Sequence, residues 1–327
     1  MFLVRIITID DIIDTFLKIK QRGLYFILSK FNLSNKSRML SAFDDSSINS
    51  SNWWNVEQVK RRWSFMISGN SDNNYQKFVM TNYIKDKSKL KLISFGSGKC
   101  HNEFEFAKYP NFELIICVDI AKNRLIEAKK NALKNGIENK IKFINKDISK
   151  FYFEKEAYDI VLFNSSLHHF KNIKKLIQTD IHSCLKKSGI LIINEYVGPN
   201  RLQFKKHQIE MINKALNTIP KKFKVRYRSN LIKNKFYGSG LIRMIVSDPS
   251  ECVESENILP SIRESFQILT EKGCGGNILM NVLKDISHNF KPINNEKINI
   301  LNQLFSFEDD YLKNNSSDFV FGVYKKR

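Results

Sequence analysis

The chain has 327 residues, of which 42% are hydrophobic and 26% are charged, and it carries a formal net charge of +20. This is an ordinary globular composition with enough apolar material for a core, and it excludes disorder as the default state, a collagen-like repeat and a disulfide scaffold. The five cysteines are scattered with no zinc-ligand spacing, so we expect buried thiols and no metal site.

Residues 1–50 have an irregular pattern, in which apolar groups at 12–17 and 24–28 predict one or two short helices. A dense aromatic cluster at 53–67 follows and predicts a helix that packs onto the next domain. A second interpretation is that part of this cluster covers a ligand pocket. We therefore expect residues 1–85 to form a helical N-terminal extension.

Residues 86–200 alternate between short apolar runs and helical patterns. Strands followed by helical crossovers predict a parallel sheet with helices on both faces. Strands are expected at 91–95, 113–120, 140–148, 158–166 and 189–196, and helices at 102–108, 122–135 and 172–186.

Residues 201–327 are less regular, and we expect them to pack on the core as an acceptor-binding elaboration that also supplies the last strands. The fold class is therefore α/β. Helices are expected at 203–219, 276–290 and 296–312, and strands at 222–228, 265–272 and 318–326.

The ends of the expected strands carry glycine or polar residues, and ligands of open parallel sheets bind at these ends. Gly96, Ser97 and Gly98 follow the first strand, where glycine permits a tight turn and close approach to a ligand. Asp119 ends the second strand and suits two ribose hydroxyls, whereas Asp147 ends the third and suits an adenine amino group. The dinucleotide fingerprint fails because His101 stands where its third glycine belongs, so a mononucleoside ligand fits better.

These motifs together resemble the class I S-adenosylmethionine-dependent methyltransferases. The resemblance is carried, in order, by SFGSGKC (94–100), VDI (118–120), KDI (146–148), DIVLFNSSLHHF (159–170) and LKKSGILIINEY (185–196). It implies a Rossmann-like seven-stranded sheet and S-adenosyl-L-methionine as cofactor, with S-adenosyl-L-homocysteine as product. The cofactor-binding residues that it implies are Gly96, Ser97, Gly98, Asp119, Ile120, Asp147, Ile148 and Asn164.

Two positions depart from the family pattern. Ser94 stands where the first motif usually has an acidic residue, and Cys100 replaces a third glycine. Glu103 or Glu105, just inside the next helix, is a candidate for a partial substitute. A narrower resemblance, carried by segments such as NEYVGPNRLQF (194–204), is to a bacterial group associated with surface-polysaccharide and glycosylation gene sets.

Methyl transfer to a hydroxyl needs a base or a hydrogen-bond acceptor beside the acceptor group. His168 and His169 follow the fourth strand and Glu195 ends the fifth, so these three are the catalytic candidates, each with a structural role as its alternative. Tyr196 and Arg201 follow directly and are candidates for binding the acceptor.

The positive charge is concentrated after the fifth strand. Residues 201–247 contain 12 basic residues and one acidic residue, Glu210. This favours an anionic acceptor, such as a phosphorylated or nucleotide-linked sugar held by Arg226 and Arg228, or contact with an anionic membrane surface. A solvated basic face with no partner is the alternative.

The leading hypothesis is an enzyme that O-methylates a sugar or another small molecule. An RNA methyltransferase is an alternative that the net positive charge favours. The chain has no recognisable RNA-binding module, so nucleic acid is not the expected partner. A catalytically silent cofactor-binding partner protein and an NAD-dependent dehydrogenase are further alternatives. We expect a cytoplasmic protein, since there is no uninterrupted apolar run of about 18 residues. The oligomeric state stays open.

Overall fold

The structure is a computed structural model whose description covers residues 4–22, 38 and 51–327. The short helix expected near 24–28 lies outside these residues. The chain divides into two compact units, each assembled from three stretches. The helical unit comprises 1–66, 198–251 and 273–319, and the sheet unit comprises 67–197, 252–272 and 320–327. No helix in the described part of the chain is long and apolar enough to cross a membrane.

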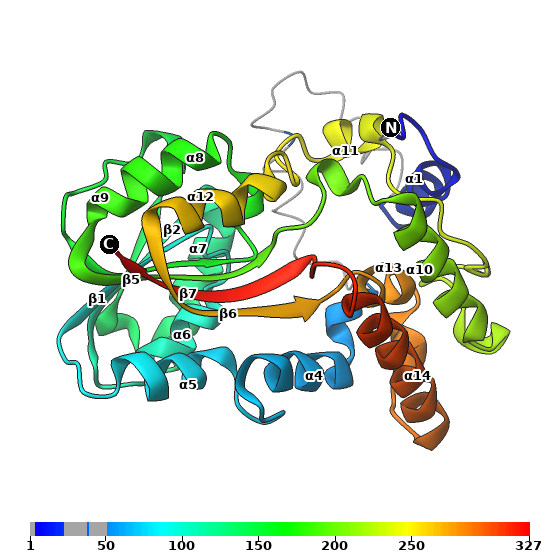
Figure 1. The fold of residues 1–327 in the computed structure, drawn as a ribbon, viewed down its shortest axis with the longest axis horizontal. Coiled ribbons are helices and arrows are strands. Elements are labelled where there is room, and N and C mark those ends of the chain that lie inside the picture. Colours follow the sequence, from blue (N-terminus) through cyan, green and yellow to red (C-terminus); the bar gives the residue numbers. More distant parts are fainter. Residues whose placement is uncertain (1–3, 23–37, 39–50) are drawn as a thin grey trace. The chain divides into compact units, whose positions relative to one another are not determined.

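The sheet unit is built on one seven-stranded sheet with the strand order β3-β2-β1-β4-β5-β7-β6. The pairs β1–β2, β1–β4, β2–β3 and β4–β5 are all parallel, whereas β6 and β7 run in opposite directions (Figure 1). The seven-stranded α/β prediction is therefore confirmed. The strands are β1 (Leu90–Phe95), β2 (Phe112–Asp119), β3 (Ile141–Asn145), β4 (Tyr158–Asn164), β5 (Leu185–Tyr196), β6 (Phe266–Gly275) and β7 (Phe319–Lys326).

Both faces of this sheet are covered, because its central strands are apolar on both sides. Figure 1 shows α8, α9 and α12 on one face and α5 and α6 on the other. The helices of the sheet unit are α5 (Tyr75–Val79), α6 (His101–Ala107), α7 (Lys122–Lys134), α8 (Ile173–Lys175), α9 (His182–Cys184) and α12 (Ile258–Ser265).

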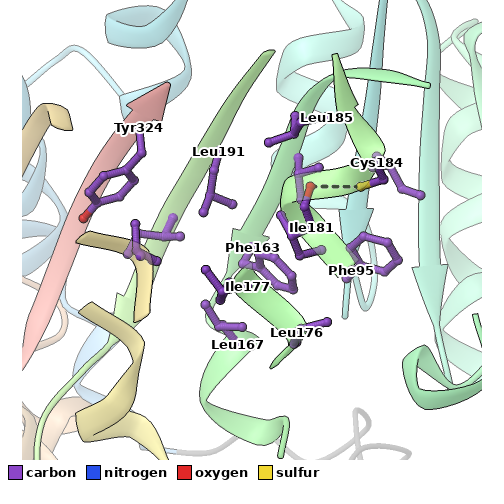
Figure 2. Close-up of a cluster of buried hydrophobic side chains, with 14 of the residues drawn as sticks. Phe95, Phe163, Leu167, Leu176, Ile177, Ile181, Cys184, Leu185, Leu191 and Tyr324 are labelled. Atoms are coloured by element: carbon purple, nitrogen blue, oxygen red, sulfur yellow. Dashed lines mark hydrogen bonds between the residues drawn. The ribbon is translucent and has the colours of Figure 1, made fainter. Parts of the chain in front are cut away.

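The core under α8, α9 and α12 is a continuous cluster of buried apolar side chains (Figure 2). Phe95 stacks on Phe163 with ring centroids 5.7 Å apart, and Tyr324 of β7 is also fully buried in the cluster. Each such side chain contributes about 1.5–3 kcal/mol by leaving water. This packing fixes the strands whose carboxyl ends form the site described below.

The helix expected at 172–186 is interrupted. A π-helical turn over Leu176–Ile181 separates α8 from α9, and β5 begins directly after α9 at Leu185. The N–H groups of Asn172 and Ile173 donate to the Glu254 carboxylate at 3.1 and 3.0 Å, so a carboxylate outside the helix caps its first turn.

The helical unit carries the remaining helices of the described residues. The Asn294 side chain accepts the Lys297 N–H at 2.9 Å and caps the longest of them, α14. The helices are α1 (Ile9–Arg22), most of α4 (Glu57–Ser68), α10 (Lys206–Thr218), α11 (Leu241–Ser247), α13 (Leu279–Leu283) and α14 (Asn295–Leu312).

The aromatic cluster seen in the sequence lies within the helical unit. Trp53 and Trp63 pack edge to face with centroids 5.7 Å apart, and both contact Phe319 at 5.5 and 5.4 Å. Such pairs add about 0.5–1.5 kcal/mol each to the burial of the rings. The cluster therefore ties residues 53–63 to Phe319, the last residue of the helical unit.

Two predictions for the helical unit are wrong. Residues 222–228 form no strand, since only an isolated antiparallel bridge joins Val225 to Ile232. The apolar–basic alternation there is misleading because Lys224 and Arg226 are buried and do not face solvent. The helix expected at 276–290 is limited to Leu279–Leu283, because Lys284 leaves the helical conformation with ψ 132° and Asp285 then adopts a left-handed one with φ +69°.

The acidic face of α1 neutralises part of the basic segment 201–247. Asp10, Asp11 and Asp14 are all buried. Arg243 Nε lies 2.7 Å from Asp11 Oδ1, and its Nη1 lies 3.3 Å from Asp14 Oδ2. Lys284 Nζ lies 2.7 Å from the same Asp14 oxygen. Burial by itself raises the pKa of Asp14, but Lys284 and Arg243 outweigh it and hold the pKa well below the usual range.

Replacing Asp14 tests this ion-pair cluster. We expect Asp14→Asn to lower the free energy of unfolding at pH 7 by roughly 2 kcal/mol, because it leaves the Arg243 and Lys284 charges without their shared partner. Because the folded pKa of Asp14 is depressed, its contribution is complete above its unfolded pKa of about 3.9 and is lost as the pH falls further. Urea unfolding followed by circular dichroism at neutral and acidic pH measures both effects.

Asp310→Asn is the matched control, because Asp310 pairs with Lys313 at 2.7 Å with both side chains largely exposed. We expect that variant to change the stability by less than about 0.5 kcal/mol. Equal effects of the two substitutions would contradict a structural role for the α1 acids.

Candidate functional site

The loop after β1 and the end of β2 are joined by the Asp119 carboxylate. Asp119 Oδ2 accepts the Gly98 N–H at 2.7 Å, and its Oδ1 accepts the Ala121 N–H, also at 2.7 Å. Each carboxylate oxygen can still accept a second hydrogen bond, so the group is held in place and remains able to bind two vicinal hydroxyls. Gly96, Ser97, Gly98 and Asp119 are thus brought together, as the sequence predicted.

Gly96 lies where the β1 loop approaches the loop after β4. A Cβ added at Gly96 would lie 2.5 Å from Ser166 Cβ, and the residue has φ +69°. Ser166 Oγ donates to the Phe95 carbonyl at 2.7 Å and locks the two loops together. Only glycine satisfies both the backbone conformation and the space at this position.

Glu195, at the end of β5, is fully buried and accepts three hydrogen bonds. The N–H groups of Ser166 and Leu167 donate to Oε1 at 2.6 and 2.8 Å, and His168 Nδ1 lies 2.7 Å from Oε2. A carboxylate partner makes Nδ1 the protonated ring nitrogen, so Nε2 of the neutral imidazole carries the lone pair. The ends of β4 and β5 therefore present an oriented histidine.

The other residues predicted near this point have different surroundings. The His169 ring lies 4.3 Å from the His168 ring, between centroids, and His169 N–H donates to the Ser166 carbonyl at 3.0 Å. Tyr196 is buried against His168 with ring centroids 6.2 Å apart. Asn164 Oδ1 accepts from Asn194 Nδ2 at 2.9 Å and ties β4 to β5.

The predicted adenine-binding residues lie beyond β3. Asp147 Oδ1 accepts the N–H and the hydroxyl of Ser149 at 2.9 and 2.8 Å, which shapes a short 3₁₀ turn. Ile148 packs against the core cluster and is partly buried, as is Ile120. The contact of Asp147 with the adenine stays a prediction, as does cofactor binding by Ile148 and by Ile120, which directly follows β2.

The predicted acceptor-binding arginines lie in the helical unit, and two of them have internal roles. Arg201 donates to the carbonyls of Asp248, Pro249 and Glu251 at 3.4, 2.8 and 3.0 Å. Arg226 is only 3% exposed; its Nη1 lies 2.8 Å from Asp285 and its Nη2 lies 3.6 Å from Asp10.

The expectation that Arg226 binds an anionic acceptor is corrected by this placement, because its charge is neutralised inside the unit. Arg228 is exposed and stacks on Tyr227 with its guanidinium 5.3 Å from the ring centroid.

Two buried polar groups of the sheet unit, Glu103 and Tyr75, were not among the site residues predicted from the sequence, although Glu103 was named as a candidate substitute for the missing acidic residue. Ser94 Oγ, at the end of β1, donates to Glu103 Oε1 on α6 at 2.5 Å. Burial raises the pKa of Glu103 to about 7. Glu103 Oε2 and the Tyr75 hydroxyl are both buried without a hydrogen-bond partner among the residues that the structure describes. The sequence signal that pointed to Glu103 was Ser94, which stands where the family motif usually has an acidic residue. No sequence pattern pointed to Tyr75.

These residues fit the cofactor that the resemblance implies. Asp119 suits the ribose hydroxyls, the glycine loop permits close approach, and the two orphaned buried atoms leave an acceptor and a donor unsatisfied. A buried polar group without a partner is costly, which indicates that a ligand completes it.

Two curated proteins are similar in sequence to part of this chain. An rRNA adenine N-6-methyltransferase of Limosilactobacillus reuteri is 34% identical over 132 residues, which are 39% of this chain and 45% of that protein. The uncharacterized methyltransferase YcgJ of Bacillus subtilis (strain 168) is 23% identical over 113 residues, which are 35% of this chain and 43% of that protein. The chain thus spans less than half the length of these two curated relatives.

A solved structure supports the fold. The geranyl diphosphate C-methyltransferase from Streptomyces coelicolor A3(2), in complex with Mg²⁺, geranyl-S-thiolodiphosphate and S-adenosyl-L-homocysteine, matches with a TM-score of 0.52. The match is 9% identical and covers 90% of this chain and 99% of that chain. The family profile described as a methyltransferase domain matches residues 86–284, which is more than half of the chain. The chain therefore belongs to the methyltransferase domain family.

Proposed function

We propose that this chain transfers the methyl group of S-adenosyl-L-methionine to an oxygen of a small acceptor, with His168 as the general base. S-adenosyl-L-methionine is the cofactor of this methyltransferase. The observation that carries the proposal for the base is the 2.7 Å contact between His168 Nδ1 and Glu195 Oε2. Both residues lie at carboxyl ends of neighbouring parallel strands, which is where ligands of such sheets bind.

The proposed reaction is an in-line displacement. The sulfonium of the cofactor supplies the electrophilic methyl group, so the protein mainly has to align the two reactants. The acceptor oxygen forms a bond to the methyl carbon as the carbon–sulfur bond breaks, which leaves a neutral thioether. The acceptor proton passes to His168 Nε2, and Glu195 stabilises the imidazolium that forms.

The acceptor that we propose is an anionic small molecule, such as a phosphorylated or nucleotide-linked sugar. The sugar rests on the narrower resemblance, and the negative charge rests on the basic segment 201–247. Although Arg226 is neutralised internally, other basic side chains of the segment remain exposed and would attract an anion. These are Lys205, Lys206, Lys214, Lys221, Lys222, Arg228 and Lys235.

A second candidate is methylation of RNA. It is favoured by the 34% identity to the Limosilactobacillus rRNA adenine N-6-methyltransferase and by the same basic side chains. The end of β4 argues against an adenine amino group as acceptor, because Asn164 is followed by Ser165, Ser166 and Leu167 and no Asn/Asp-Pro-Pro-Tyr motif is present.

Turnover of radiolabelled S-adenosyl-L-methionine separates these candidates. With nucleotide sugars, sugar phosphates and ribosomal RNA as separate acceptors, we expect label transfer to one of the small anionic sugars. Transfer to RNA alone would support the second candidate. Binding of S-adenosyl-L-homocysteine without transfer to any acceptor would point to a catalytically silent binding protein and contradict the proposal.

Substitutions of the His168–Glu195 pair test the base. We expect His168→Ala to lower kcat by about 10²–10⁴-fold with little change in cofactor affinity, because it removes the proposed general base. Glu195→Gln should have a smaller effect in the same direction, since it removes the charge that orients the ring and stabilises its protonated form. Steady-state kinetics and calorimetry with S-adenosyl-L-homocysteine measure the two quantities.

His182→Ala is the control, because His182 lies three residues before β5 begins and hence at the opposite edge of the sheet from Glu195. We expect it to leave kcat unchanged. Normal turnover by His168→Ala would exclude His168 as the base, and a large loss in His169→Ala alone would assign the role to its neighbour.

A further inference from the structure

Three buried side-chain atoms of the sheet unit have no hydrogen-bond partner among the described residues; one belongs to the half-buried Glu138, and the other two belong to buried residues. These two are Glu103 Oε2 on α6 and the Tyr75 hydroxyl at the start of α5. Glu103 is 2% exposed and Tyr75 is 6% exposed. An unsatisfied carboxylate oxygen or hydroxyl on a buried residue is costly, so a ligand that completes both groups is favoured.

Neighbouring groups hold these two residues in place. Ser94 at the end of β1 fixes the first Glu103 oxygen with a 2.5 Å hydrogen bond, so the second oxygen is the one left to a ligand. The Tyr75 ring packs against Phe106 of α6 and Phe321 of β7 with centroids 6.2 and 5.6 Å apart. Both orphaned atoms therefore belong to rigid, packed side chains.

The electrostatic surroundings favour a cation beside Glu103. The pKa of Glu103 is raised to about 7, chiefly by burial; the Ser94 hydrogen bond opposes this rise and the charge of Asp119 adds to it. Burial likewise raises the pKa of Tyr75, and the charges of Glu103 and Glu195 add to the effect. Glu103 is thus a buried carboxylate beside a second one, Asp119, and a positive charge that binds next to it stabilises its ionised form.

We propose that Glu103 and Tyr75 bind the amino-acid end of the cofactor. The Glu103 carboxylate accepts a hydrogen bond from the ammonium group, and the Tyr75 hydroxyl donates one to the α-carboxylate. The ribose of the same ligand is assigned to Asp119, the last residue of β2, which pairs with β1. This inference rests on the proposed function. It adds the residues that bind the amino-acid end of the cofactor, which is the part outside the adenosine.

The test is a comparison of two ligands by calorimetry on the full chain. S-adenosyl-L-homocysteine contains the amino-acid end, whereas 5′-methylthioadenosine contains the adenosine and thioether without it. We expect Glu103→Gln to weaken binding of S-adenosyl-L-homocysteine by about 10- to 100-fold, the usual effect of losing a charged hydrogen bond. Its affinity for 5′-methylthioadenosine should equal that of the wild type.

Three further variants sharpen the comparison. Glu105→Gln is the matched control, because Glu105 lies on the same helix with its carboxylate 2.6 Å from Lys108 Nζ at the surface, and it should change neither affinity. Tyr75→Phe should weaken only S-adenosyl-L-homocysteine, by a smaller factor. Ser94→Asp combined with Glu103→Gln returns a carboxylate to the same neighbourhood and should restore part of the lost affinity.

The pH dependence gives an independent readout. Because the ammonium prefers the ionised Glu103, the wild-type affinity for S-adenosyl-L-homocysteine should rise between about pH 6 and pH 8, and Glu103→Gln should lack this rise. The titratable groups facing Glu103 are Asp119 and Cys117 of β2 and Tyr75 of α5. The pKa values of Cys117 and Tyr75 are raised by burial, so neither group loses its proton in this range.

The outcomes are distinguishable. Unchanged binding of S-adenosyl-L-homocysteine by Glu103→Gln, or an equal loss for both ligands, would overturn this inference while leaving the cofactor assignment intact. A wild-type protein that binds neither ligand would overturn the proposed function together with the inference.

Discussion

The site depends on how buried carboxylates obtain hydrogen-bond donors at the carboxyl ends of a parallel sheet. A buried carboxylate is tolerated only when its oxygens are paired. Asp119 takes backbone N–H groups from the β1 loop and from the residue that precedes α7, and this ties the two strand ends together. Glu195 takes two backbone N–H groups and the His168 ring. Among the described residues only one Glu103 oxygen is paired, and this is why we propose that the other oxygen binds a ligand.

The charge of the chain has two separate explanations. Part of the basic segment after β5 pairs with the acids of α1, as the contacts of Arg243 with Asp11 and Asp14 show. Arg226 is likewise neutralised by Asp285 and Asp10. The other part is exposed and supports the proposal of an anionic acceptor. A charge excess in sequence therefore identifies a partner only after the internal ion pairs are known.

The sequence predicted the sheet unit well because its information is local there. Each strand of the core is a short apolar run with a polar residue at its end, so the sequence alone places Asp119 and Glu195 at the carboxyl edge of the sheet. The helical unit was harder, because Lys224 and Arg226 are buried by tertiary contacts that no alternation pattern encodes. Tyr75 could not be found for the same reason, because the role that we propose for its hydroxyl depends on its burial near Glu103, which lies 28 positions later in the sequence.

The most direct test of these assignments is a crystal structure of the full chain with S-adenosyl-L-homocysteine bound. We predict both ribose hydroxyls on the Asp119 carboxylate and the ammonium nitrogen within about 3.2 Å of Glu103 Oε2. We also predict that the Tyr75 hydroxyl gains a partner in the α-carboxylate. Ribose bound away from Asp119, or an amino-acid end that leaves Glu103 Oε2 and the Tyr75 hydroxyl unpaired, would contradict these assignments.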